Sequence, residues 1–192
     1  REALEVYTLE NFPQQWAVTQ SNLGAALMRH GERSNGEVSV RLLTKAIIAC
    51  REALKVRTRE QSPQQWTMTQ NNLAKAFYLL GDWRNAAAGY ANVLMLYPQY
   101  EEGYQRLSSI YHEHLFEPAK AFDLHSKWLT LFPDQVFVLA DFVEVHFTTG
   151  RFNEFEERIK TVLDHPELPS KTKIALRMIE IANLLALNKT ER

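Results

Sequence analysis

Apolar residues recur every three to four positions along most of this chain, which is the spacing of one face of an α-helix. Leu73, Ala76, Phe77 and Leu80 form one such row. Glycines and prolines separate the rows, so the pattern predicts a chain built of helices. The predicted helices span residues 1–10, 13–30, 38–60, 63–80, 83–97, 100–114, 118–132, 135–148, 152–165 and 171–188.

The first half of the chain repeats itself. Residues 1–27 align without gaps to residues 51–77, with 16 of 27 positions identical, so the period is 50. In the second copy Ser62 offers a capping oxygen ahead of Pro63, and Gln65 is placed to complete a capping box. Phe12 replaces that serine in the first copy. The spacing therefore predicts a repeated helical unit that restarts at each proline.

A shorter version of the unit follows. The turns at 81–85 and 150–154 share the order glycine, polar, aromatic, polar, polar. Pro98 and Pro133 each follow a helix that ends in an aromatic residue, and their separation is about half of the separation between the two turns. The basic unit is therefore roughly 34 residues long, a length typical of helical repeats. The period of 50 is this unit with an insertion.

A two-helix unit of this length with a small residue beside leucine, a turn glycine and a closing proline resembles the tetratricopeptide repeat. Leu73-Ala74, Phe77, Gly81 and Pro98 carry the closest match. The segment from Trp16 to Leu23 and its copy resemble the kinesin-light-chain-like bacterial subset. The resemblance implies an all-α, right-handed superhelix of antiparallel helix pairs, an α-α solenoid with an extra C-terminal helix. One solenoid over 1–192 would divide into the second helix of a truncated repeat (1–10), an extended repeat (13–60), a repeat (63–98), a degenerate repeat without a turn glycine (99–133), a repeat (134–166) and a terminal helix (170–189).

By the same resemblance, the first helix of each pair lines a concave face that binds a peptide. Asn22 and Asn72 precede the leucine of each copy, where the family implies an amide that bonds a bound peptide's backbone. An amide both donates and accepts, which suits a peptide bond; the alternative is that each asparagine bridges neighbouring helices. Lys75 is a candidate for a bound carboxylate, although the next first helix offers Glu101 and Glu102. The other expected members of this face are Asn71, Gln70, Tyr78, Gln105 and His112.

The predicted last helix is apolar on more than one side. Ile174, Met178, Ile181 and Leu185 form one row, and Leu176, Ile179, Leu184 and Leu187 form a second. A terminal helix of a repeat array should be polar outside. We therefore expect the second row, through Leu184 and Leu187, to be covered by a following domain, a partner or a second copy. The alternative is that both rows are buried within the chain.

Composition narrows the chemistry. The 22 basic and 23 acidic residues give a net charge of −1, without the basic field that nucleic-acid binding requires. Cys50 is the single cysteine, which excludes an internal disulfide framework and favours a reducing, cytoplasmic compartment. No apolar run is long enough to span a membrane. His112 and His114 are two apart on a predicted helix and point to different faces, so we expect no metal site, no cofactor and no catalytic residues.

These observations predict a non-enzymatic protein–protein interaction module that binds a peptide or protein segment. The chain opens on Arg1 without a methionine, so we expect it to be part of a larger bacterial protein. One alternative is a regulatory scaffold segment of an effector enzyme, a CHAT-like protease or an NTPase, whose catalytic domain lies outside this chain. A further alternative is a small-molecule sensor.

Overall fold

The computed structural model describes residues 2–132, 152–164, 166, 168 and 170–190, and these residues form helices and the turns between them, without a strand. The predicted helix over 135–148 lies outside the described residues. The chain divides into two compact units, residues 1–110 and 111–192. None of the described helices has the length and apolar character needed to cross a bilayer.

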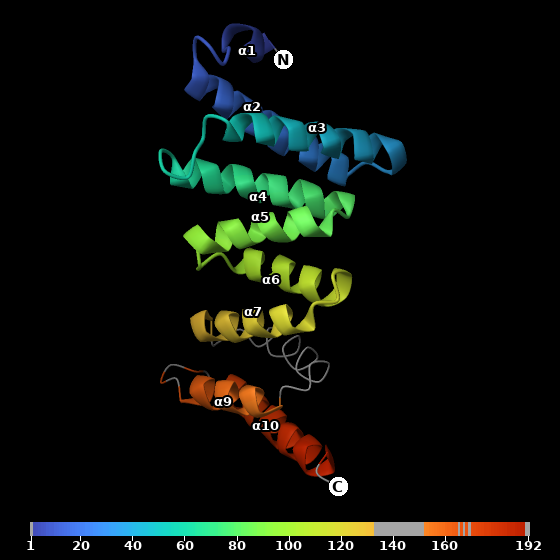
Figure 1. Ribbon diagram of the computed structural model, residues 1–192, viewed down its shortest axis with the longest axis vertical. Helices are drawn as coiled ribbons and strands as arrows, with labels where there is room; N and C mark the ends of the chain where they lie inside the picture. Colours follow the sequence, from blue (N-terminus) through green and yellow to red (C-terminus); the bar gives the residue numbers. More distant parts are fainter. Residues whose placement is uncertain (1, 133–151, 165, 167, 169, 191–192) are drawn as a thin grey trace. The chain divides into compact units, whose positions relative to one another are not determined.

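The first unit is a succession of helices in which each packs against the next along the chain (Figure 1). Helix α4 also contacts α2, so the first helices of the two repeated copies are neighbours as well. This arrangement buries one side of every long helix against the helices before and after it. The helices are α1 (Glu2–Val6), α2 (Pro13–Glu32), α3 (Gly36–Leu54), α4 (Pro63–Leu80), α5 (Trp83–Leu96) and α6 (Glu101–Ser109).

Small residues set how closely the helices of each pair approach. A Cβ added to Gly24 of α2 would lie 2.6 Å from Cys50 Sγ of α3. In the second copy the corresponding residue is Ala74 of α4, and its Cβ would lie 2.6 Å from a Cβ added to Gly89 of α5. Both copies thus have a small residue at the same position of the repeat, at the point where the following helix crosses. The resulting burial raises the pKa of the Cys50 thiol to about 12, which keeps it protonated at neutral pH.

The same turn precedes α2 and α4, and it differs from the predicted capping box. Thr8 Oγ1 accepts a hydrogen bond from the Asn11 amide at 3.2 Å, and Thr58 Oγ1 accepts one from the Gln61 amide at 3.2 Å. The Ser62 hydroxyl donates to the Thr58 carbonyl instead of capping α4, so the predicted cap is wrong. A threonine turn followed by proline therefore starts the helix in both copies, which explains why Phe12 is tolerated in the first.

Helix α3 ends at Leu54, six residues before its predicted end. Arg57 turns inward just beyond it and is only 8% exposed, with Nη1 donating to Thr69 Oγ1 of α4 at 3.0 Å. Thr69 Oγ1 also lies 3.2 Å from Ser21 Oγ of α2. This buried polar chain joins α2, α4 and the turn between α3 and α4, and burial lowers the pKa of Arg57. Helix α1 likewise ends at Val6, because the turn at Thr8 begins where the helix was predicted to continue.

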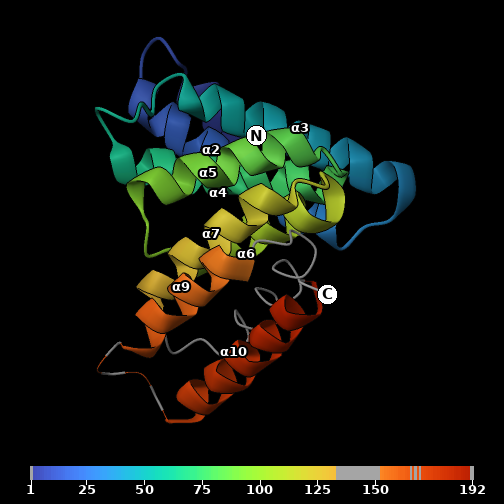
Figure 2. The same cartoon turned by 60° about the horizontal axis from the view of Figure 1, so that its bottom comes forward.

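The second unit contains α7 (Pro118–Leu131), α9 (Phe152–Leu163) and α10 (Ser170–Thr190). Helix α9 contacts both α7 and α10, and the α9–α10 pair is seen at the orange and red end of the chain in Figure 2. The buried side chains of the second unit include Phe122 and Trp128 of α7, Ile159 of α9 and Leu176 of α10. A core of large side chains therefore lies between successive helices here too.

A π-helix, η1 (Ile110–His114), leads to an unusual turn at Phe116. Phe116 follows Leu107 by nine positions, whereas Gly81 follows the corresponding Leu73 by eight. The additional residue is taken up by the π-helix, since such a turn holds one residue more than an α-turn. Phe116 then adopts the left-handed backbone, with φ 53°, that Gly81 adopts with φ 77°. The repeat predicted to lack a turn glycine thus makes the same turn with a phenylalanine.

Replacing Phe116 by glycine is expected to stabilise the second unit by about 1 kcal/mol, because a left-handed backbone costs a residue with a side chain roughly 1–2 kcal/mol. The ring is 80% exposed, so little packing is lost. Urea unfolding followed by circular dichroism measures the change. Phe116→Ala is the control, since it removes the ring and keeps the strained backbone, and it should leave stability nearly unchanged. Equal effects of the two substitutions would contradict backbone strain as the cause.

Candidate functional site

A cavity of about 490 Å³ opens on the first unit beside α4. Four residues of α4 face it at the spacing i, i+3, i+4 and i+7, which places them on one side of the helix. Its opposite wall comes from the end of α5 and the turn that leads to α6. The lining residues are Gln64, Thr67, Met68 and Asn71 from α4, and Val93, Tyr97, Gln99 and Tyr100 from the opposite wall.

The described side chains that line the cavity are all uncharged. Met68 and Tyr97 are 66% and 38% exposed, so their apolar surface is accessible to a ligand. Three side-chain amides, those of Gln64, Asn71 and Gln99, stand around this surface. An apolar surface with a few orienting polar groups is the usual composition of a binding pocket, and its volume lies within the usual range of about 300–1,000 Å³.

Asn71 has the most constrained polar group in the cavity. Its Oδ1 is buried and accepts no hydrogen bond from any described residue. Its side chain is hydrogen-bonded to Tyr100, whose Oη also donates to Glu102 Oε2 at 2.9 Å. Burial and Glu102 together raise the pKa of Tyr100 to about 12, against a lowering by Asn71, so the phenol stays protonated. The site therefore contains a neutral phenol and a buried amide oxygen that accepts no hydrogen bond from the described residues.

The other residues expected on a peptide-binding face are dispersed. Asn22 is exposed and Asn72 is partly buried, and neither is among the residues that line the cavity. Gln70 is partly buried on α4 and Gln105 is exposed on α6. His112 is partly buried and belongs to the second unit. The structure thus brings Asn71 alone of the predicted residues into the cavity.

The predicted carboxylate-binding lysine is already paired. Lys75 Nζ of α4 lies 3.2 Å from Glu32 Oε1 of α2. The basic residue on the next first helix, Arg106, has its guanidinium 5.1 Å from the centre of the Tyr78 ring, and its Nε lies 3.6 Å from Glu102 Oε1. Tyr78 also packs edge-to-face against Trp83, with ring centres 5.3 Å apart. These side chains tie neighbouring helices together, which weakens the case for a carboxylate site here.

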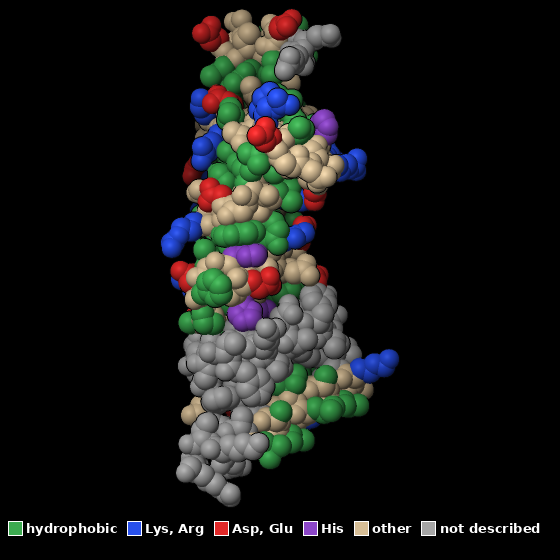
Figure 3. All heavy atoms as spheres, turned by 90° about the vertical axis from the view of Figure 1, so that its right-hand side faces the viewer, with side chains coloured by type: hydrophobic (Ala, Val, Ile, Leu, Met, Phe, Trp, Pro, Cys, Tyr) green, Lys and Arg blue, Asp and Glu red, His purple; other side chains and the backbone are tan. Residues whose placement is uncertain are grey.

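The described structure offers little that would bind a metal ion or a strongly charged ligand. No group of three or more histidine, cysteine or acidic side chains among the described residues is arranged to hold a metal ion. The face in Figure 3 shows acidic and basic side chains of the described regions interspersed, without a continuous basic stripe. The cavity is consequently the strongest candidate site, and its uncharged lining suits an uncharged ligand.

Comparison with known proteins does not place the chain in a family. No protein-family model matches it, and no curated protein matches it. The candidate function therefore rests on the sequence pattern and on the geometry of the site.

Proposed function

We propose that this protein is a tetratricopeptide-type helical repeat protein, a right-handed α-α solenoid, that acts as a non-enzymatic protein-interaction module. Support comes from the internal repeat, from the packing of each helix in the first unit against the next, and from the small residues at the same register of α2 and α4. Repeat proteins of this construction offer extended surfaces that hold other polypeptides. The single buried thiol, Cys50, is compatible with a cytoplasmic location.

The observation that carries the binding proposal is the uncharged cavity beside α4, with Asn71 in its wall. Side-chain amides can donate to and accept from a peptide bond whatever its side chains are. The exposed apolar surface of Met68 and Tyr97 suits an uncharged side chain of the bound segment. The proposed ligand is thus a peptide segment with an apolar residue seated in the cavity and its backbone facing the amides.

Selection from a random peptide library on the full chain tests this function. Met68→Glu places a charge at the cavity and should weaken the selected peptides by at least about tenfold, which corresponds to roughly 1.4 kcal/mol. Met95→Glu is the matched control, because Met95 is also an exposed methionine on a neighbouring helix but does not line the cavity. Titration calorimetry measures both affinities.

Unchanged binding to Met95→Glu with weakened binding to Met68→Glu supports the proposal. Equal affinities of the two variants would place the peptide elsewhere on the surface. A selection that enriches no peptide would contradict peptide binding by this chain.

A further inference from the structure

Helix α10 carries a narrow apolar row that faces solvent. Ile174, Met178, Ile181 and Leu185 are 63%, 67%, 58% and 59% exposed. They are spaced by four, three and four residues, so at 3.6 residues per turn they fall on a single line along the helix. Hydrophobic side chains are visible along the described part of this helix in Figure 3. An aligned row of this kind is a contiguous patch, which marks an interaction surface more often than a scatter of single apolar residues does.

The opposite side of α10 is the side that packs within the chain. Leu176 is fully buried there, and Ile179 is partly buried. The Glu180 side chain is 13% exposed, and its charge helps to raise the pKa of Lys160 on α9. Leu176 and the exposed row differ by about half a turn of the helix. The packing of α10 on α9 therefore leaves the exposed row without a partner in the described structure.

The exposed row differs from the one we expected to be covered from outside. The row containing Leu176 turns inward at Leu176, which is fully buried, so the predicted outer contact through Leu184 and Leu187 stays a prediction. Leu184 is 43% exposed and lies at the edge of the exposed row. The side chain of Leu187 lies outside the described residues.

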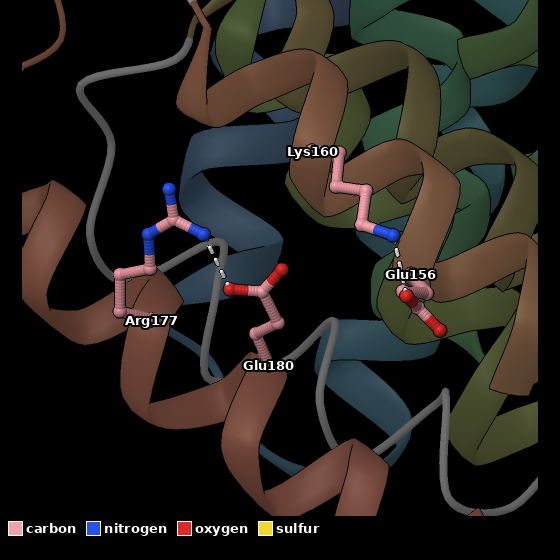
Figure 4. Close-up of polar contacts among 4 residues, drawn as sticks. All are labelled: Glu156, Lys160, Arg177 and Glu180. Carbon is pink, nitrogen blue, oxygen red and sulfur yellow. Dashed lines mark hydrogen bonds and ion pairs between the residues drawn. The ribbon is translucent and has the colours of Figure 1, made fainter.

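The ion pairs described on α9 and α10 each lie within a single helix. Arg177 Nη1 lies 2.7 Å from Glu180 Oε2 on α10, and Lys160 pairs with Glu156 on α9 (Figure 4). The exposed row itself contains no ionisable residue. A partner for it must therefore be apolar along a line, which is the property of another helix with the same spacing.

We propose that the exposed row of α10 is the interface through which two copies of this chain associate, with their α10 helices antiparallel across a two-fold axis. A four-three-four spacing is the seam by which helices interlock side chains. An axis between Met178 and Ile181 sets Ile174 opposite Leu185 of the second copy, so the row is complementary to itself. Ala175 and Ala182 flank it on one side and leave room for close approach.

The area available agrees with a dimer. Covering the four residues of the row and Leu184 on both copies, with the flanking side chains, buries on the order of 1,200 Å² in total, the lower limit of stable, specific interfaces. A membrane surface fits less well, because the row is narrow and has no aromatic residue to seat at the lipid interface. We therefore expect a dimer in reversible equilibrium with the monomer.

Sedimentation equilibrium of the full chain over a range of concentrations tests the proposal. Wild type should show a monomer–dimer equilibrium, and Ile181→Glu should weaken it at least about 100-fold because it places two unpaired charges at the centre of the interface. Ile48→Glu on α3 is the matched control, since Ile48 is 55% exposed, and it should dimerise like wild type. Both sites are exposed, so circular dichroism should show folded proteins.

Cysteine cross-linking tests the antiparallel arrangement. A mixture of Ile174→Cys and Leu185→Cys should give a disulfide-linked dimer under mild oxidation, because these two positions face each other across the axis. Neither variant alone should cross-link, because its two introduced cysteines lie at opposite ends of the interface and the native Cys50 is buried. A wild-type monomer at all concentrations, a dimer that survives Ile181→Glu, or a dimer lost in Ile48→Glu would each overturn the proposal. So would a wild-type monomer that sediments with anionic phosphatidylserine vesicles through Ile181, which would assign the row to a membrane.

Discussion

Replacing Gly89 by alanine is expected to lower the free energy of unfolding of the first unit by about 1 kcal/mol, which is the usual cost of an overpacked core less the helix-propensity gain of alanine. The new Cβ would lie 2.6 Å from the Cβ and 3.2 Å from the Cα of Ala74, so α5 must move away from α4. Overpacking of this kind costs roughly 1–3 kcal/mol, and it here exceeds the gain of about 1 kcal/mol that alanine brings to a helix interior. Chemical denaturation followed by circular dichroism measures the change.

A second-site substitution distinguishes this clash from other causes. Ala74→Gly removes the methyl group that the new Cβ meets, and glycine already stands at the corresponding position of the first copy, Gly24. The double variant should therefore be more stable than the sum of the two single effects predicts. Additive effects, or a Gly89→Ala protein as stable as wild type, would show that α4 and α5 are not in close contact at this point.

Acidification from pH 6.5 to pH 4 is expected to destabilise the second unit by about 3 kcal/mol through one buried histidine. His125 of α7 is 1% exposed, and its Nδ1 lies 2.9 Å from the Ala121 carbonyl oxygen, to which the neutral ring donates. Its ring stacks on Trp128 with centres 6.0 Å apart. Burial lowers its pKa to about 4, against a rise from the Ala121 hydrogen bond and with a further lowering by the charge of His112.

The direction of this pH effect follows from the protonation of His125 in the folded chain and in the unfolded chain. Above about pH 6.5 the histidine is neutral in the folded and the unfolded chain, so its contribution to stability is fully present. Between pH 6.5 and 4 the unfolded chain binds the proton while the folded chain excludes it, and stability falls as the pH falls. Urea unfolding at a series of pH values, followed by tryptophan fluorescence and by circular dichroism, measures this slope.

His125→Phe is the control for the pH effect. It keeps an aromatic ring against Trp128 and removes the titrating group, so the loss of stability between pH 6.5 and 4 should be about 3 kcal/mol smaller than in wild type. An unchanged slope would assign the acid sensitivity to other groups and would show that His125 is accessible to solvent.

The sequence pattern predicts most helices within a few residues because their boundaries are set by local chemistry. Helix α4 spans Pro63–Leu80 as predicted, between a proline at its start and Gly81 in the left-handed conformation at its end. The errors arise where tertiary contacts decide. Helix α3 stops at Leu54 because Arg57 reaches across to Thr69, a contact that no local spacing reveals.

The candidate site was predictable only in part for the same reason. Asn71 stands out in the sequence because it belongs to a repeated helix face with polar residues. The rest of the cavity on α4, Gln64, Thr67 and Met68, shares its helical spacing and could have been found from it. The wall formed by Tyr97, Gln99 and Tyr100 depends on how the following turn folds back, which periodicity does not encode.

The π-helix before Phe116 changes how insertions in this chain should be understood. The spacing from Pro98 to Pro133 is one residue longer than the basic unit. Because η1 takes up the additional residue inside a helix, the turn that follows it matches the turn before α5. Glu117 is the N-cap residue of α7, as Asp82 is the N-cap residue of α5. Repeat length can thus drift by single residues without a longer loop. An alignment that admits gaps only between helices would miss the equivalence of these two turns.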